Sequence, residues 1–158
     1  MPDLVVNTGP IIGLTAALGD LKILDSIYEE ILLPKEVFDE LSAGGKDCAE
    51  IRAIDAVSCV RIPSEYQKIP VLLGSELDKG EASVIQAAIQ QEVPVVAIDE
   101  KQGRRIARLH SIKVTGSIGI LLKGKRNGLV SNLEVCLDRM RSQGIWISRE
   151  LREQALSD

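Results

Sequence analysis

Short apolar runs alternate with segments of helical periodicity along the whole chain. The runs cover residues 4–7, 29–34, 57–62, 93–99 and 112–116. Helical patterns cover residues 10–18, 20–27, 34–43, 46–56, 79–91, 100–110, 117–126, 131–142 and 148–156. Strands that alternate with helices pair in parallel, because each crossover helix returns the chain to the same end of the sheet. The pattern therefore predicts an α/β fold with a parallel sheet flanked by helices.

One segment does not fit this alternation. Residues 64–80, SEYQKIPVLLGSELDKG, mix the two periods, and we expect an irregular loop with one short strand. No repeat, low-complexity tract or linker interrupts the chain, which predicts a single domain over residues 1–158.

Composition is that of a globular domain. The chain has 158 residues, of which 45% are hydrophobic, enough for one core. No basic segment precedes an apolar run at the N-terminus, and no apolar run approaches the ~20 residues that span a bilayer, so we expect a cytoplasmic protein. The three cysteines, Cys48, Cys59 and Cys136, form no CxxC pattern, which argues against a disulfide framework and a structural zinc site.

The net charge of −4 does not by itself indicate a nucleic-acid-binding protein. It does not exclude one, because net charge ignores how charges are distributed and a metal site needs acidic residues. Aromatic residues make up 3% of the chain, which argues against a stacking surface for single-stranded bases. We expect the only tryptophan, Trp146, to be buried against the domain or a partner.

Two apolar runs end on polar residues. The first, in LVVNTGPIIG, ends on Asn7 and Thr8, and the fourth ends on Asp99. Such residues can belong to a turn or cap the next helix. They are also candidate site residues, because parallel α/β sheets bind ligands beyond the carboxyl ends of their strands. Both interpretations stay open.

Two further acids border the predicted core on helices. Glu40 lies four residues after Glu36, beside the apolar stripe of Val37 and Leu41. Glu81 falls in the first turn of the helix over residues 79–91, where the helix dipole favours a carboxylate in any case. Each alone is more often an ordinary acid, and it is the set with Asn7 and Asp99 that points to a site.

Basic and hydroxyl residues follow two of the strands. Lys101, Arg104, Arg105 and Arg108 recur at helical spacing after Asp99, where they can contact RNA phosphates or form a solvated face. Thr115 and Ser117 lie between a strand and a helix and can line the pocket or cap the helix. The stretch from Gly119 to Lys125 nearly matches a phosphate-binding loop, but Arg126 breaks the motif.

Five segments occur in an order that resembles one known family. They are VVNTGPIIGL, ILLPKEVFDEL, LDKGEASVIQAA, VVAIDEKQGRRIA and VTGSIGILLKGKRNGLV. Together they resemble the PIN-domain superfamily, in particular the PIN-like proteins related to VapC-type toxins. The resemblance covers nearly the whole chain.

The resemblance implies a Rossmannoid three-layer α/β/α sandwich and hydrolysis of RNA with Mg²⁺ or Mn²⁺. Its four acidic positions fall on Asn7, Glu40, Glu81 and Asp99, and its small hydroxyl residue falls on Thr8. In the commoner nuclease pattern an Asp stands where this chain has Asn7. Oxygen ligands suit such ions, and Mg²⁺ binds through one or two carboxylates while keeping several waters.

The sequence and the resemblance together predict a metal-dependent endoribonuclease, the toxin of a toxin–antitoxin pair, with a small antitoxin protein as partner. The expected RNA contacts are Thr8, Lys101, Arg104, Arg105, Thr115 and Ser117. The alternative is a catalytically weak or inactive module of the same fold that binds RNA or protein. The resemblance also implies a homodimer, for which the apolar helices near residues 10–27 offer a face.

Overall fold

The computed structural model describes residues 1–158 and contains one sheet of five parallel strands. The strands are β1 (Leu4–Val6), β2 (Ile31–Leu32), β3 (Val60–Arg61), β4 (Val95–Ala97) and β5 (Lys113–Thr115). Their order across the sheet is β3-β2-β1-β4-β5. In the central pair, Val5 lies opposite Val96 and Val6 opposite Ala97. The predicted parallel sheet is confirmed.

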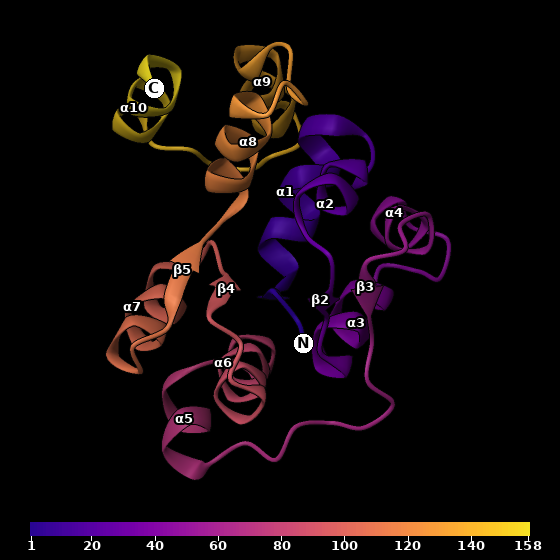
Figure 1. The fold of residues 1–158 in the computed structure, drawn as a ribbon, viewed down its shortest axis with the longest axis vertical. Helices are drawn as coiled ribbons and strands as arrows, with labels where there is room; N and C mark the ends of the chain where they lie inside the picture. The colour runs from indigo at the N-terminus through magenta and orange to yellow at the C-terminus, as the bar shows by residue number, and fades with distance from the viewer.

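Ten helices surround this sheet. They are α1 (Thr8–Leu18), α2 (Lys22–Ile27), α3 (Lys35–Ser42), α4 (Ala49–Asp55), α5 (Val71–Glu76), α6 (Lys79–Gln91), α7 (Lys101–Leu109), α8 (Ser117–Arg126), α9 (Leu133–Ser142) and α10 (Arg149–Ser157). Helix α1 packs against α8 and α9 on one side of the sheet, and α6 packs against α5 and α7 on the other (Figure 1). The protein is a three-layer α/β/α sandwich, as the sequence and the resemblance predicted.

Residues 64–80 differ from the prediction. They contain no strand; the chain runs irregularly to Pro70 and then forms the six-residue helix α5. Pro70 occupies the N-cap, and its fixed φ is compatible with the start of a helix. Val71 and Leu72 are 87% and 83% exposed, so this helix has no amphipathic pattern that a sequence could reveal.

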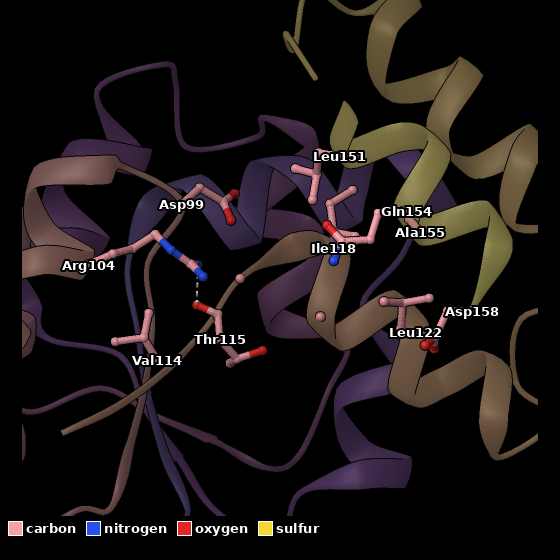
Figure 2. Close-up of a pocket in the computed structure, with 12 residues that line it drawn as sticks. Asp99, Arg104, Val114, Thr115, Ile118, Leu122, Leu151, Gln154, Ala155 and Asp158 are labelled. Carbon is pink, nitrogen blue, oxygen red and sulfur yellow. Dashed lines mark hydrogen bonds between the residues drawn. The ribbon is translucent and has the colours of Figure 1, made fainter. Parts of the chain in front are cut away.

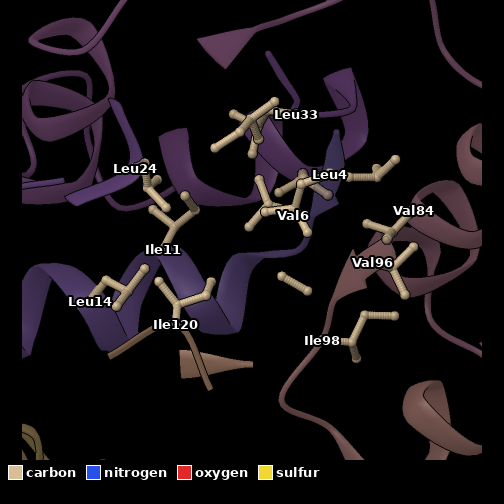
Figure 3. Packing of buried hydrophobic residues seen from close by; sticks show 14 of the residues in the cluster. Leu4, Val6, Ile11, Leu14, Leu24, Leu33, Val84, Val96, Ile98 and Ile120 are labelled. Atoms are coloured by element: carbon tan, nitrogen blue, oxygen red, sulfur yellow. The ribbon is translucent and has the colours of Figure 1, made fainter. Parts of the chain in front are cut away.

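The hydrophobic core joins both helical layers to the sheet. Leu4 and Val6 of β1 lie among Ile11 and Leu14 of α1 and Ile120 of α8 (Figure 3). These side chains are fully buried, which fixes the start of α1 at the end of β1. The apolar residues of α1 and α2 are therefore used inside the chain, and only Ile12 among them is exposed, at 39%. The expectation that residues 10–27 present an apolar dimer face is wrong.

Cysteine and membrane predictions can be compared directly with the structure. All three cysteines are free, and Cys59 and Cys136 are buried. Burial and a hydrogen bond with Asp25 raise the pKa of the Cys59 thiol to about 12, so this thiol stays protonated. No helix combines the length and apolar character that crossing a membrane requires.

The order of the strands creates a switch point at the centre of the sheet. The chain proceeds outward from β1 to β2 and β3, then returns to the other side of β1 with β4 and β5. Loops at the carboxyl ends of β1 and β4 therefore diverge and leave a crevice between them. Asn7 and Asp99 follow those two strands, so the fold places both at this edge.

Candidate functional site

Asn7 occupies the N-cap position of α1 but makes no cap with its side chain. Its backbone N–H donates to the carbonyl oxygen of Ala97 at 3.0 Å, which continues the pairing of β1 with β4. The residue is only 4% exposed, and its side-chain Oδ1 has no hydrogen-bond partner. Buried polar atoms are nearly always paired, so this unpartnered oxygen requires an explanation.

Gly80, in the first turn of α6, allows oxygens from three elements to come close to one another. A Cβ added there would lie 2.8 Å from Glu40 Oε2, 3.2 Å from Asn7 Oδ1 and 3.6 Å from Asp78 Oδ1. A larger residue would displace these oxygens, so the side chains of Asn7, Glu40 and Asp78 meet at the glycine backbone. The structure thus brings Asn7 and Glu40 close to each other and adds Asp78.

Asp78 was not predicted as a site residue. It is the N-cap of α6, and its Oδ1 accepts a hydrogen bond from the Glu81 backbone N–H at 2.8 Å. The sequence did contain an indication, because Asp78 precedes Glu81 by three residues, the spacing of a capping box. Its carboxylate acts as a cap and also contributes negative charge beside Glu40 and Glu81.

Glu81 is held in the interior of this acidic group. It is 7% exposed, and its Oε2 has no hydrogen-bond partner. A Cβ added at Gly103 of α7 would lie 2.5 Å from that oxygen, so a larger residue there would displace the Glu81 carboxylate. Desolvation raises the pKa of Glu81 to about 7, with further contributions from Asp78, Glu100 and Glu40. A nearby cation would lower this pKa again.

Glu40 lies at the solvent-exposed edge of the same group. Desolvation and the charge of Asp78 raise the pKa of its carboxyl group. It lines an open cavity of about 440 Å³ together with Glu36, Asp39, Asp78, Lys79 and Gly80. Four of these six lining residues are acidic, so the cavity attracts cations.

Asp99 is engaged by the start of α8. Its Oδ1 accepts from the Ser117 backbone N–H at 2.8 Å, and its Oδ2 accepts from the Ser117 hydroxyl at 2.6 Å. The N-cap of α7 is Glu100, which makes no side-chain cap. Asp99 therefore caps α8, not α7, the helix that follows it in sequence. A Cβ added at Gly9 would lie 3.2 Å from Asp99 Oδ2, which places this carboxylate beside the first turn of α1.

A second cavity of about 440 Å³ opens on the side of Asp99. Asp99 and Arg104 form part of its wall, and Leu151 and Gln154 of α10 lie across from them (Figure 2). The remaining lining residues are Val114, Thr115, Gly116, Ile118, Gly119, Leu122, Ala155 and Asp158. The C-terminal helix therefore covers one side of the strand end that carries Asp99.

The predicted RNA contacts separate into internal and exposed residues. The Arg104 guanidinium donates to the carbonyl oxygens of Ile98 and Thr115, at 2.8 and 3.2 Å, and Figure 2 shows it turned toward Thr115. Desolvation by burial, with a smaller contribution from Arg108, lowers the pKa of Arg104. Ser117 is 2% exposed and bound to Asp99. Arg104 and Ser117 thus serve the fold.

The other predicted contacts are more accessible. Lys101 and Arg105 of α7 are exposed. Thr8 lines a small cavity beside Glu40, and Thr115 lines the cavity beside Asp99. Trp146 is 84% exposed, so the expectation that it is buried against the domain is wrong.

The donor atoms suit a hard divalent ion that keeps part of its water shell. Asn7 Oδ1 and Glu81 Oε2 are buried oxygens without partners, and Glu40 approaches the same backbone segment as Asn7. No three acidic, histidine or cysteine side chains lie close enough to enclose an ion by themselves. Mg²⁺ needs no such enclosure, because it commonly takes one or two carboxylates and retains several waters. The residues therefore fit a hydrated ion and not a fully protein-coordinated one.

Comparison with known families agrees with the fold. A family model described as a PIN domain matches residues 3–158. The chain belongs to the PIN-domain family. The PIN domain is a nuclease-type fold associated with nucleic-acid binding, and PIN domains generally use divalent metal ions. No curated protein matches the sequence.

Proposed function

We propose that this PIN domain is a metal-dependent endoribonuclease that hydrolyses phosphodiester bonds of RNA. The main support is the pair of buried, unpartnered oxygens, Asn7 Oδ1 and Glu81 Oε2, beside the carboxylates of Glu40 and Asp78. An arrangement of acids that raises the pKa of its own members is unfavourable in an empty pocket and favourable around a cation.

Mg²⁺ or Mn²⁺ would be held by Asn7, Glu40, Glu81 and Asp99, with Asp78 added to the set. The ion supplies a Lewis acid that neutralises the carboxylates and the phosphodiester. Beside the ion Glu81 would be ionised and would act as a ligand, because a cation lowers the pKa that burial and the neighbouring acids raise. Asp99 is oriented by Ser117, so its oxygens stay at the carboxyl end of β4.

Asn7 weakens such a site by a definable amount. One unit charge lost about 4 Å from a cation forfeits about 4 kcal/mol per cation charge at an effective dielectric of 20. The amide oxygen remains a possible ligand, and a neutral side chain costs less to bury than a carboxylate. We therefore propose an attenuated metal site.

A catalytically weak or inactive module that binds RNA or protein is the second candidate. Two observations favour it: Asn7 stands at the position of the first acid, and no three acidic side chains form a closed metal cluster. A degenerate pocket can still recognise RNA through its hydroxyl and basic rim residues.

The biological role is proposed from the family resemblance. In that role the protein is the toxin of a toxin–antitoxin pair, a small antitoxin protein inhibits it, and it forms a homodimer. A short reading frame beside its gene whose product inhibits RNA cleavage would support this proposal.

Asn7→Asp is the most direct test of the enzyme proposal. The substitution adds a charged ligand, so calorimetry should show tighter Mn²⁺ or Mg²⁺ binding, and any RNA cleavage should increase. Asp99→Asn should abolish both, while Asp55→Asn, on the exposed end of α4, should change neither. If neither the wild type nor Asn7→Asp binds a divalent ion at millimolar concentration, the enzyme proposal fails and the binding module replaces it.

A further inference from the structure

Two lysines and one tyrosine stand together at the rim of the acidic cavity. The Nζ atoms of Lys35 and Lys79 lie 4.5 and 5.7 Å from the centroid of the Tyr66 ring. Lys35 is the first residue of α3 and Lys79 the first residue of α6. The same two helices carry Glu40 and Glu81, so the lysines and the acids are fixed relative to one another.

The loop that carries Tyr66 is attached to α3 through two acids. The Tyr66 hydroxyl donates to Asp39, and the Gln67 backbone N–H donates to Glu36 Oε2 at 2.7 Å. Asp39 and Glu36 thus hold the loop in place. The ring is kept beside the two ammonium groups by these contacts.

Neither lysine forms an ion pair, although both stand near carboxylates. The six salt bridges of the protein involve the N-terminus and Arg61, Arg126, Arg149 and Arg152, but no lysine. No side-chain hydrogen bond uses the Nζ of Lys35 or Lys79 either. The lysines are held by the face of an aromatic ring, which leaves their N–H donors free for an anion.

We propose that Lys35 and Lys79, positioned by Tyr66, bind a backbone phosphate of single-stranded RNA at the edge of the acidic cavity. This inference rests on the proposed function and adds the groups that hold the substrate. A chain with a net charge of −4 and a cavity lined by four acids repels RNA unless positive charge stands at its rim. Lysine binds phosphate as a point charge without reading sequence, so the contact is independent of the base.

The geometry also assigns different roles to the three residues. Lys35 and Lys79 contact the phosphate, whereas Tyr66 is a positioning residue that acts through them. A ring with an ammonium group on it has limited room for a stacked base, so the site binds the backbone. Among the basic residues of α7, Arg104 is less suited to bind this phosphate, because its guanidinium is already bound to carbonyl oxygens inside the fold.

RNA binding without divalent ions tests this inference separately from catalysis. Fluorescence anisotropy would measure the affinity of a labelled single-stranded oligoribonucleotide in EDTA across a series of salt concentrations. For Lys35→Gln/Lys79→Gln we expect at least tenfold weaker binding and a slope of log K against log salt smaller by about 0.7–1.4, the value for one or two lost contacts. The matched control Lys46→Gln/Lys113→Gln changes two exposed lysines, alters net charge equally and should bind within twofold of wild type.

Variants of Tyr66 test its positioning role. Tyr66→Phe keeps a ring for the cation–π contacts and should bind RNA within twofold of wild type, whereas Tyr66→Ala should bind several-fold more weakly. Thermal unfolding confirms that each variant is folded. If wild type binds RNA but does not cleave it with Mg²⁺ or Mn²⁺, the enzyme proposal fails and this inference stands. Equal binding by the lysine pair variant and its control, or no RNA binding by wild type, would overturn the inference.

Discussion

Asn7 combines a fold requirement with a chemical one. Its backbone extends the pairing of β1 with β4, while its buried Oδ1 has no partner. In the absence of an ion, a neutral amide is easier to bury there than a charged carboxylate. Asn7 therefore weakens a metal site, but it costs less to bury than Asp would when no ion is bound.

This argument predicts that the stability of Asn7→Asp depends on metal. In EDTA the buried carboxylate would lie beside Glu40 and Asp78, and we expect the free energy of unfolding to fall by about 1–3 kcal/mol. Mn²⁺ at millimolar concentration should restore much of this loss and should stabilise wild type less. Urea unfolding with and without Mn²⁺ measures both effects, and a loss that Mn²⁺ does not reverse would contradict a metal site at Asn7.

The raised pKa of Glu81 predicts that the stability of the fold depends on pH. Its pKa is raised from 4.5 to about 7 in the folded protein, so the folded state binds more protons than the unfolded state between these values. The contribution of protonated Glu81 to the free energy of unfolding is therefore fully present below about pH 4.5 and is lost as pH rises through 7. Glu81→Gln should be more stable than wild type at pH 8 by about 1–3 kcal/mol and equal to it near pH 4.5. Chemical unfolding at a series of pH values measures the difference, and a constant difference would show that Glu81 ionises normally.

Close approach between helices depends on glycine at two positions of this site. Gly80 in α6 leaves room for Glu40 and Asn7, and Gly103 in α7 leaves room for Glu81. Both helices thereby pack against carboxylates that a larger residue would displace. The site is built by elements that meet at their backbones.

Gly103→Ala should therefore perturb Glu81 despite the higher helix propensity of alanine. The new Cβ would lie 2.5 Å from Glu81 Oε2 and 3.0 Å from Ile98 Cγ2, and we expect a loss of about 1–3 kcal/mol in unfolding free energy. Gly74→Ala in α5 is the matched control, since its Cβ meets only Ile69 at 3.5 Å and should be neutral or slightly stabilising. Thermal unfolding of both variants makes the comparison. Equal behaviour would show that Glu81 can move aside at little cost.

Helices and strands could be predicted from the sequence where a single pattern of apolar residues determined them. The apolar stripe of Ile85 and Ala88 marks α6, so the predicted range 79–91 matches the structure. The strands are shorter than their apolar runs, because those runs include buried residues beyond the paired segment, such as Ile98. Helix α5 could not be predicted, since its apolar residues Val71 and Leu72 face solvent.

The part of the candidate site that lies at the ends of strands could be predicted from the sequence. Asn7 and Asp99 follow adjacent strands, and their common edge follows from the parallel order. The contact of Asp99 with Ser117 joins residues 18 positions apart and depends on how α8 packs. Likewise Tyr66 reaches Lys35 and Lys79 through a loop whose path has no periodic pattern.

One exposed apolar surface of the molecule lies on the side of α5. Leu72, Ile89 and Leu109 are 83%, 41% and 69% exposed and line a cavity of about 410 Å³ with Pro70 and Ile106. Adjacent exposed apolar residues of this kind often mark an interaction surface. Because α1 and α2 bury their apolar residues, the proposed homodimer would form through this surface between α5, α6 and α7.

Leu72→Glu tests that assembly. If two copies pair through this surface, each interface buries two Leu72 side chains at about 1.5–3 kcal/mol each, so a charge there should weaken the dimer at least tenfold. The fold should be unaffected, because Leu72 contributes little to the core. Light scattering over micromolar concentrations should show a dimer for wild type and a monomer for Leu72→Glu, while Ile12→Glu on α1 should stay dimeric. A monomeric wild type would contradict the homodimer, and a dimer that survives Leu72→Glu would place its interface elsewhere.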